Sequence, residues 1–324
     1  MINMNVLLTG ASGFVGRHVL LALQKQGYRT HAVYRTAPAP KDCAKNVVRV
    51  IVDMSPRTDW EEILEGIDAV IHTGDGLRVF EGQKTAPSDT ASGDGAVATT
   101  MALARAAQAS SVRTFVYLSS IKAASGYCAS HVLSESDAPS PGRPFYGKLK
   151  ARLEGQLASL GTQRESGGMY MVSLRSPIVY GVGGTGNFGR LVALADTPFP
   201  LPLANMSNRR SIVSVANLAD GLVRAAENPN SCAGHYFIHD GPPLAMAELV
   251  ALLREALGRR RRLFPVPGLL ARMAGNLPVA GPVVSRLSRD LEVSSKKFET
   301  DFGWQPPQPA REALYAMARE TLVK

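Results

Sequence analysis

Tyr146 and Lys150 are the residues whose types and spacing most directly suggest chemistry. They stand four residues apart in Pro144-Phe145-Tyr146-Gly147-Lys148-Leu149-Lys150, a segment that predicts the start of a helix, so both side chains would lie on one helical face. A phenol ionises at about pH 10, and a neighbouring ammonium favours its phenolate form. The pair could therefore move a proton near neutral pH. A half-buried tyrosine beside a solvated lysine is the alternative, because this spacing also occurs by chance in helices.

A glycine-rich segment near the N-terminus gives this pair a context. The chain reads Asn5-Val6-Leu7-Leu8-Thr9-Gly10-Ala11-Ser12-Gly13-Phe14-Val15-Gly16 before an amphipathic stretch, which predicts a strand, a tight turn and a helix. Gly10 permits the turn, Gly13 lets the backbone approach a pyrophosphate, and Gly16 lets the helix pack on the strand. The helix N-terminus would then face the phosphates. The first two glycines are three residues apart rather than two, and a glycine-rich turn in another α/β protein is the alternative.

Length and composition are those of a soluble enzyme of 324 residues with one sizeable or two unequal domains. Neither a secretory leader pattern nor an apolar run long enough to span a membrane is found, so we expect a cytoplasmic protein without membrane insertion. Three cysteines, at positions 43, 128 and 232, suit neither a disulfide framework nor a zinc site. We therefore expect no metal.

The net charge of +9, from 36 Lys and Arg against 27 Asp and Glu, would suit nucleic acid, an anionic membrane surface or small anionic ligands. The one dense basic run, Arg259 to Arg262, follows a helix that ends at Gly258. Such a run more often complements a helix dipole than binds nucleic acid, and no aromatic residues are interleaved with it. We expect no nucleic acid partner.

The elements that must position these residues alternate between strands and helices. Short apolar or β-branched runs predict strands at 30–34, 47–52, 69–72, 113–119 and 169–175, and apolar stripes predict helices at 17–25, 59–65, 95–109 and 146–160. This alternation predicts an α/β fold with a doubly wound parallel sheet. Beyond Pro177 the chain becomes rich in glycine and proline. We expect a dinucleotide-binding domain over 1–176, joined again by about 212–235, and a smaller substrate-binding region over 177–324.

With these elements placed, the chain resembles the extended short-chain dehydrogenase/reductase family, the NAD-dependent epimerases and dehydratases, from end to end. Besides the glycines and the Tyr-Lys pair, the resemblance rests on Asp53-Met54, Leu118-Ser119-Ser120, Leu174-Arg175-Ser176-Pro177, Arg209-Arg210-Ser211-Ile212-Val213 and Asn217-Leu218-Ala219-Asp220. Three further phrases are similar to bacterial enzymes that act at C4 of UDP-linked N-acetyl-6-deoxyhexoses: Ser119-Ser120-Ile121-Lys122, Gly186-Asn187-Phe188 and Asp301-Phe302-Gly303-Trp304-Gln305-Pro306. The resemblance implies a Rossmann domain over 1–176.

By this resemblance three residues are catalytic. Tyr146 would move the alcohol proton, Lys150 would lower the tyrosine pKa and hold the nicotinamide ribose, and Ser120 would hydrogen-bond the substrate oxygen. Ser119 is a rival for Ser120, and a serine that only caps the strand end is the alternative. Placing the strand phrase Phe115-Val116-Tyr117 against that of the family favours Ser120.

The end of the second strand bears on the choice of cofactor. NAD-preferring members usually carry an acid there, whereas this chain has Tyr34-Arg35, and an arginine can pair with a 2′-phosphate. NADP(H) is therefore favoured and NAD(H) stays possible, with an exposed loop arginine as the alternative. Asp53 would accept from the adenine amino group. The implied cofactor-binding residues are Gly10, Ser12, Gly13, Phe14, Val15, Gly16, Tyr34, Arg35, Asp53, Met54, His72, Thr73, Gly74, Tyr146, Lys150, Ser176, Pro177 and Ile178.

Four residues are expected to contact the substrate: Lys122, Asn187, Arg209 and Arg210. By the resemblance Arg210, and less firmly Arg209, clamps a UDP diphosphate, and Asn187 touches the diphosphate or the sugar. Lys122 would either reach the substrate or lie on the rim. Weaker candidates for a second phosphate contact are the arginines at 286 and 289.

Some positions depart from the family pattern. His72-Thr73-Gly74-Asp75-Gly76 stands where relatives usually have His-Leu-Ala-Ala, which puts a carboxylate beside the expected nicotinamide edge. Ala96 stands where an asparagine usually opens the next helix, so Asp94 is expected to cap that helix instead. The loop at 79–92 is also unlike that of relatives. These departures leave the three catalytic residues intact and leave the substrate and the cofactor's position open.

The sequence therefore predicts an enzyme that reduces a UDP-4-keto-6-deoxy-N-acetylhexosamine. Hydride would be delivered from NADPH to C4, and Tyr146 would be the proton donor. A UDP-sugar 4-epimerase with tightly bound NAD uses the same residues and is the alternative. A non-catalytic NADP(H)-sensing protein is less favoured, because such a module has no need of the three catalytic residues together. Relatives often form homodimers through two helices that correspond to 95–109 and 146–160, so a homodimer is possible.

Overall fold

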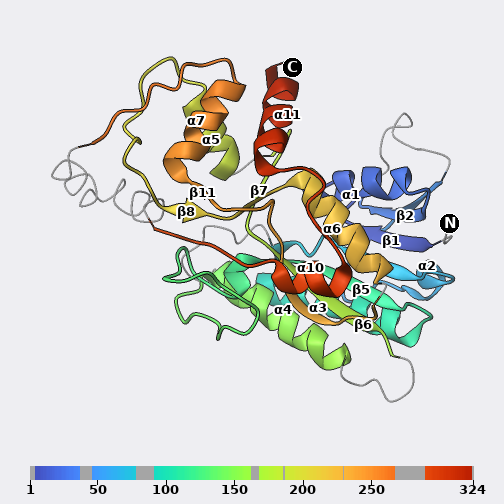
Figure 1. The fold of residues 1–324 in the computed structure, drawn as a ribbon. Helices are drawn as coiled ribbons and strands as arrows, with labels where there is room; N and C mark the ends of the chain where they lie inside the picture. Colours follow the sequence, from blue (N-terminus) through green and yellow to red (C-terminus); the bar gives the residue numbers. More distant parts are fainter. Residues whose placement is uncertain are drawn as a thin grey trace.

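A parallel sheet of seven strands runs through the larger part of the molecule (Figure 1). The computed structural model describes residues 4–36, 46–77, 91–161, 168–184, 187–228, 230–266 and 289–322. In spatial order the strands are β10 (Gly234–Phe237), β6 (Tyr170–Ser176), β5 (Thr114–Ser120), β4 (Ala69–His72), β1 (Asn5–Thr9), β2 (Arg29–Tyr34) and β3 (Val47–Ile51). All four residues of β4 are buried, because helices cover both faces of the sheet.

Helices cover the two faces of the sheet in separate layers (Figure 1). On one face α1 (Phe14–Lys25), α6 (Val215–Glu227) and α10 (Lys296–Phe302) share a core with the side chains of Val6 and Leu8. On the other face α2 (Glu61–Leu64), α3 (Ala91–Ala109) and α4 (Phe145–Gly161) share a core with those of Leu7 and Val70. Alternate residues of β1 therefore enter opposite cores, as the two-residue period of a strand requires. The predicted α/β class with a doubly wound parallel sheet is confirmed.

The predicted strands lie within one residue of the observed ones, whereas two helices begin earlier than predicted. The helix predicted from residue 17 begins at Phe14, directly after the glycine-rich turn, and the helix predicted from residue 95 begins at Ala91. Both differences have one physical reason. The first turn of a helix does not need the apolar stripe on which the prediction relied, so such a stripe locates a helix more closely than it locates the helix's first residue.

A smaller region stands over the carboxyl ends of the strands and has a core of its own (Figure 1). It contains two small sheets, one pairing β7 (Ile178–Tyr180) with β9 (Ile212–Ser214) and one pairing β8 (Arg209–Arg210) with β11 (Leu244–Ala245). Its helices are α5 (Asn187–Ala195), α7 (Met246–Ala256) and α11 (Ala310–Leu322). Between the small sheets the chain returns to the large one through α6 and β10. A division of the chain at residue 176 stays a prediction.

A buried carboxylate fastens the two regions together. Asp240 accepts hydrogen bonds from the Tyr180 hydroxyl, from the Ser214 backbone N–H at 2.7 Å and from the Asn217 side-chain amide at 2.7 Å. Tyr180 and Ser214 belong to β7 and β9, and Asn217 lies in the first turn of α6. Burial raises the pKa of Asp240 to about 6. This network holds the smaller region on the large sheet, at the edge where ligands of such folds bind.

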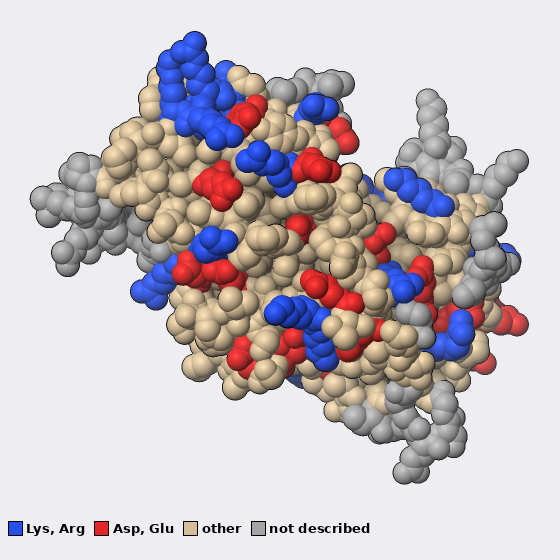
Figure 2. Space-filling view, in the orientation of Figure 1, with Lys and Arg blue, Asp and Glu red and all other residues tan. Residues whose placement is uncertain are grey.

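The surface carries charges of both signs, and Lys and Arg gather over one end of the smaller region, near α7 (Figure 2). Arg259 to Arg262 are exposed just beyond that helix, where Arg259 pairs with Asp196 and Arg261 pairs with Glu255. Within the described ranges no helix has both the length and the apolar character needed to cross a bilayer. Among the same residues no cluster of His, Cys, Asp and Glu could hold a metal ion.

The apolar stripes of α3 and α4 face inward. Leu103 and Ala104 of α3, and Leu149 and Leu153 of α4, belong to the core beneath the sheet. The outward faces of these helices carry small or charged residues, including an exposed ion pair between Asp94 and Arg152. The possible homodimer through these two helices stays a prediction.

Candidate active site

The glycine-rich loop joins β1 to α1 and is closed by contacts that only glycine allows. Gly10 has a φ of +74°, and a Cβ on it would lie 2.8 Å from the Gly74 backbone. A Cβ on Gly16 would lie 1.9 Å from the Gly10 carbonyl oxygen. Ser12 and Gly13, at the start of the helix, are exposed. The loop therefore leaves open space in front of the α1 N-terminus, whose unpaired N–H groups suit the pyrophosphate of a dinucleotide.

The predicted adenosine end lies beyond β2 and β3. The Arg35 guanidinium is 3.4 Å from the Asp53 carboxylate, and both side chains are more than four-fifths exposed. They are free to meet a ligand from solvent. Tyr34, by contrast, is buried in the core, and Met54 is partly buried against the opposite core. Of the four residues predicted here, the structure brings only the charged pair to the open edge.

The segment after β4 packs against the glycine loop. The His72 ring is fully buried, with Nδ1 2.6 Å from the Thr9 hydroxyl and Nε2 3.0 Å from the Thr100 hydroxyl. Thr73 donates its hydroxyl proton to the Thr9 carbonyl oxygen at 2.7 Å. The His72 side chain is therefore taken up by contacts in the interior, and the Thr73 hydroxyl, which is partly buried, by its bond to Thr9. Gly74, through its contact with Gly10, remains at the surface of the loop.

Two adjacent serines end β5, and their environments differ. Ser120 is partly exposed, and its hydroxyl oxygen accepts a hydrogen bond from the Lys122 backbone N–H at 3.3 Å. Ser119 is only 2% exposed, and its hydroxyl has no hydrogen-bond partner among the described residues. Accessibility therefore favours Ser120 as the residue that a substrate could reach.

Tyr146 lies in the first turn of α4, near two ammonium groups. The Nζ atoms of Lys150 and of Lys122 are each 5.7 Å from the centre of the Tyr146 ring. Lys122 belongs to a short 3₁₀ helix, η3 (Ile121–Ala123), that packs directly against α4. A Cβ on Gly147 would lie 2.1 Å from the Lys122 carbonyl oxygen, so this approach requires glycine. The structure thus brings Ser120, Tyr146 and Lys150 to one edge of the sheet.

Asp75 forms a buried ion pair with Lys150 that the sequence did not reveal. The Lys150 ammonium donates to Asp75 Oδ2 at 2.7 Å and to the Leu118 carbonyl oxygen at 2.7 Å. The Tyr117 hydroxyl donates to the same Asp75 oxygen at 2.7 Å, and the Leu77 backbone N–H donates to Oδ1 at 3.1 Å. The sequence signal was a carboxylate where relatives have alanine, but 75 residues separate it from its partner.

The charges of this pair are mutually stabilised. Burial works to raise the pKa of Asp75, but the Lys150 ammonium, His72 and the Tyr117 hydroxyl together outweigh burial and hold that pKa below its ordinary value. Burial likewise works to lower the pKa of Lys150, but the Asp75 carboxylate, Tyr146 and Glu154 together outweigh burial and raise that pKa. Both groups are therefore ionised at neutral pH, although each side chain is at most 6% exposed.

The residues predicted for the nicotinamide end follow β6. The Ser176 hydroxyl donates to the Ser119 carbonyl oxygen at 3.3 Å, and Pro177 is buried. Ile178 begins β7 and pairs with Ile212. These residues therefore lie where the sheet passes into the smaller region, next to the end of β5.

The arginines predicted for the substrate lie between the two regions. Arg210 is buried and donates to the carbonyl oxygens of Tyr127 and Arg289, each at 3.2 Å. Tyr127 in turn contacts Lys122, whose Nζ is 5.6 Å from the ring centre. Arg209 is more exposed and donates to the Pro243 carbonyl oxygen. Asn187 is the first residue of α5, and residue 286 and the loop at 79–90 lie outside the described residues.

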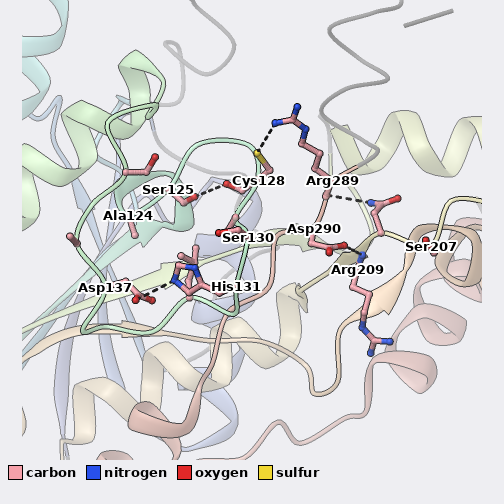
Figure 3. Close-up of a pocket in the computed structure, with 15 residues that line it drawn as sticks. Ala124, Ser125, Cys128, Ser130, His131, Asp137, Ser207, Arg209, Arg289 and Asp290 are labelled. Atoms are coloured by element: carbon pink, nitrogen blue, oxygen red, sulfur yellow. Dashed lines mark hydrogen bonds and ion pairs between the residues drawn. The ribbon is translucent and has the colours of Figure 1, made fainter. Parts of the chain in front are cut away.

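A cavity of about 660 Å³ opens between the loop after η3 and the segments at 207–209 and 289–290 (Figure 3). Arg209 and Arg289 are on its lining, together with Ser125, Cys128 and His131. The Arg289 guanidinium points toward Cys128, whose sulfur is 3.8 Å away (Figure 3). None of the three predicted catalytic residues lines this cavity. It therefore borders the predicted substrate region rather than the proton-transfer site.

A parallel sheet, a glycine loop at a helix N-terminus and a Tyr-Lys pair at the same edge define a nucleotide-dependent α/β enzyme. The family described as the NAD dependent epimerase/dehydratase family matches residues 6–238. The chain belongs to this family and is a nicotinamide-dependent enzyme.

Comparison with individual proteins agrees with this assignment. The UDP-glucose 4-epimerase of Vibrio cholerae is 30% identical over 98% of this chain and 95% of its own length. The 3-beta-hydroxysteroid dehydrogenase of Mycolicibacterium neoaurum is 27% identical over 95% of this chain and 89% of its own length. The solved structure of UDP-glucuronic acid 4-epimerase from Bacillus cereus in complex with NAD has a TM-score of 0.71, at 20% identity over 99% of this chain and 100% of that one.

Proposed function

We propose that the enzyme transfers hydride at C4 of a UDP-linked sugar, with Tyr146 as the group that moves the alcohol proton. One observation carries the proposal: the Lys122 and Lys150 ammonium groups each lie 5.7 Å from the centre of the Tyr146 ring, at the edge where β5 ends in Ser120. Positive charge near a phenol favours the phenolate and so makes the group usable in proton transfer. The name of the relative from Vibrio cholerae supports a UDP-sugar as the substrate.

Each of these residues would have a separate part in the reaction. When bound, the nicotinamide supplies or accepts the hydride. In the direction of reduction, Tyr146 gives its hydroxyl proton to the substrate oxygen as the carbonyl becomes an alcohol, and the phenolate then regains a proton from solvent. The Ser120 hydroxyl donates a hydrogen bond to that oxygen and aligns it with the phenol. Lys150 supplies a positive charge at the phenol and an N–H for the ribose.

The specific reaction we propose is reduction of a UDP-4-keto-6-deoxy-N-acetylhexosamine by NADPH. Arg35 supports the phosphorylated cofactor, because a guanidinium and no carboxylate follows β2 directly. A UDP-sugar 4-epimerase with retained NAD is the second candidate, favoured by the name of the 30% identical relative. Arg209, Arg210 and Arg289 support a diphosphate over the uncharged sterol named for the other relative.

The cofactor itself separates the two reactions. The nucleotide released from the purified protein would be identified, and the emptied protein would then be titrated with NADPH and with NADH. An empty or exchangeable site that prefers NADPH is expected for the reductase, and the next assay would then use UDP-4-keto sugars. Tightly retained NAD that does not exchange would overturn the reductase in favour of the epimerase.

The proton-transfer role is tested at Tyr146. Tyr146→Phe removes only the hydroxyl group, so turnover of the UDP-sugar should fall at least about 100-fold while cofactor affinity stays near that of the wild type. Tyr315→Phe on α11 is the matched control and should turn over normally. Retained turnover in Tyr146→Phe would defeat the assignment, because it would show that the reaction does not need the Tyr146 hydroxyl. Absence of turnover in both wild type and variant, with cofactor bound, would instead favour an NADP(H)-sensing protein.

A further inference from the structure

Asp75 carries a buried negative charge, which needs hydrogen-bond donors or a positive charge nearby to stabilise it. It lies just beyond β4 with its side chain only 6% exposed, and a carboxylate buried without partners loses most of its hydration. Every contact of this group serves to hold it ionised: Lys150 and Tyr117 donate to Oδ2, and the Leu77 backbone N–H donates to Oδ1. Burial and the adjacent carboxylate raise the pKa of Tyr117 well above its ordinary value, so its hydroxyl remains a donor.

The Lys150 ammonium has three N–H groups, and two of them are already used. One points to Asp75 and one to the Leu118 carbonyl oxygen, both at 2.7 Å. The ammonium also lies 4.6 Å from the centre of the Tyr117 ring, on the floor of the site. A single N–H remains for a ribose hydroxyl or for the phenol side of the site. Lys150 is therefore held in one position before any ligand binds.

Three kinds of titratable group surround the pair: an uncharged ring, a second ion pair and a second ammonium. From β4, burial lowers the pKa of His72 to about 4, so the ring is uncharged at neutral pH. From α4, Glu154 is paired with the Arg175 guanidinium at 2.7 Å. From η3, the Lys122 ammonium lies as close to the Tyr146 ring as Lys150 does.

We propose that Asp75 is a positioning residue: it fixes the Lys150 ammonium against Leu118 and offsets the charge that this ammonium exerts on the Tyr146 phenol. This proposal rests on the proposed function only for the role of Tyr146. Two opposite charges 2.7 Å apart act on a third group as a dipole, whose effect falls off faster than that of a single charge. The Lys150 ammonium then lowers the pKa of the phenol less than a lone ammonium at the same place would.

The test measures ionisation of Tyr146 in the protein without substrate, so it stands even if the UDP-sugar reaction is wrong. Phenolate absorbance is titrated against pH for each protein, and the matching Tyr146→Phe titration is subtracted. Asp75→Asn keeps the shape of the side chain and removes its charge. The apparent pKa of Tyr146 should fall by about one unit, a tenfold gain in phenolate.

A matched control separates charge from structure. Tyr117→Phe breaks a hydrogen bond to the same Asp75 oxygen but keeps the carboxylate, so it should shift the Tyr146 titration by less than half as much. An unchanged Tyr146 titration in folded Asp75→Asn would overturn the proposal. So would an equal shift in Tyr117→Phe, because the effect would then come from loosening the network.

A second variant keeps the question answerable if Asp75→Asn does not fold. Asp75→Asn with Lys150→Met removes both charges, so no lone buried ion remains. If Asp75 offsets Lys150, the double variant titrates at Tyr146 close to the wild type. If Asp75 has no such effect, losing Lys150 raises the Tyr146 pKa by about one unit or more, and the proposal fails.

Discussion

At the scale of single residues, Arg35 and Asp53 form an ion pair in water beyond the ends of β2 and β3. An exposed pair of this kind contributes less than about 1 kcal/mol to stability. Because so little free energy is lost when the pair breaks, the Arg35 guanidinium can turn from Asp53 toward the 2′-phosphate of a ligand. The pair is therefore the residue-scale feature that bears on cofactor choice.

Arg35→Ala should weaken NADPH binding by about tenfold or more, because one charge-assisted contact to the phosphate is lost. NADH affinity should change by less than about threefold, and the thermal unfolding midpoint should hardly move. Fluorescence titration with both nucleotides provides the measurement. Arg29→Ala, at the exposed start of the same strand, is the control and should leave both affinities unchanged. Equal losses for NADPH and NADH would argue against a phosphate contact.

Pairs of residues that are close in the chain could be predicted from the sequence. Pairs that are distant in the chain and meet only in the folded protein could not. The four-residue spacing of Tyr146 and Lys150 indicated a shared helical face without any structure. The partner of Lys150 could not be found that way, because Asp75 meets it only after β4 and α4 are packed together. Glu154 was missed for the same reason: it is buried in a two-pronged ion pair with Arg175 of β6.

At the scale of elements, α1 and α4 each depend on a glycine at which a backbone approaches closely. Gly16 of α1 lies against the Gly10 carbonyl oxygen, and Gly147 of α4 lies against η3. The glycine pattern of the first loop was readable from the sequence because its spacing is regular. The need for Gly147 was not, since nothing in the chain near it indicates that η3 packs there.

Gly16→Ala should destabilise the protein by about 3 kcal/mol and weaken nucleotide binding, because the added methyl group would lie 1.9 Å from a carbonyl oxygen. Urea unfolding and nucleotide titration measure the two effects. Gly155→Ala is the matched control: it lies within α4 with nothing inside 4 Å of the added Cβ. It should stabilise the protein by about 0.5 to 1 kcal/mol. A Gly16→Ala protein as stable as the wild type would mean that the loop can open at little cost.

At the scale of the whole molecule, two buried groups on opposite sides of the site give the stability a pH dependence. His72 ties β4 to β1 and α3, and burial lowers its pKa from 6.5 to about 4. The unfolded chain therefore binds more protons between these values, so the contribution of His72 is complete above about pH 6.5 and is lost as the pH falls toward 4. Asp240 has the opposite sign, because its raised pKa makes the folded state bind the extra proton between 3.8 and about 6.

The two contributions partly cancel in the wild type, and single variants should separate them. The stability advantage of the wild type over His72→Gln should shrink by about 3 kcal/mol as the pH falls from 6.5 to 4. Urea unfolding at a series of pH values measures it. For Asp240→Asn the trend reverses, with the variant gaining on the wild type as the pH rises from 4 to 6. If the free energy of unfolding changed with pH in the same way in His72→Gln and in the wild type, protonation of the His72 ring would not destabilise the folded protein.

The order of strands in the large sheet also has a consequence for how the protein is made. The edge strand β10 pairs with β6, yet it follows β6 in the chain only after β7, α5, β8, β9 and α6 have intervened. During synthesis the edge of β6 stays open until Phe237 has left the ribosome, although every strand between β1 and β6 is already available. An open strand edge invites pairing with another chain. A fragment that stops at residue 176 should therefore aggregate more readily than the full chain, because it exposes the seven-residue edge of β6, whereas in the full chain the edge strand is the shorter β10, of four residues.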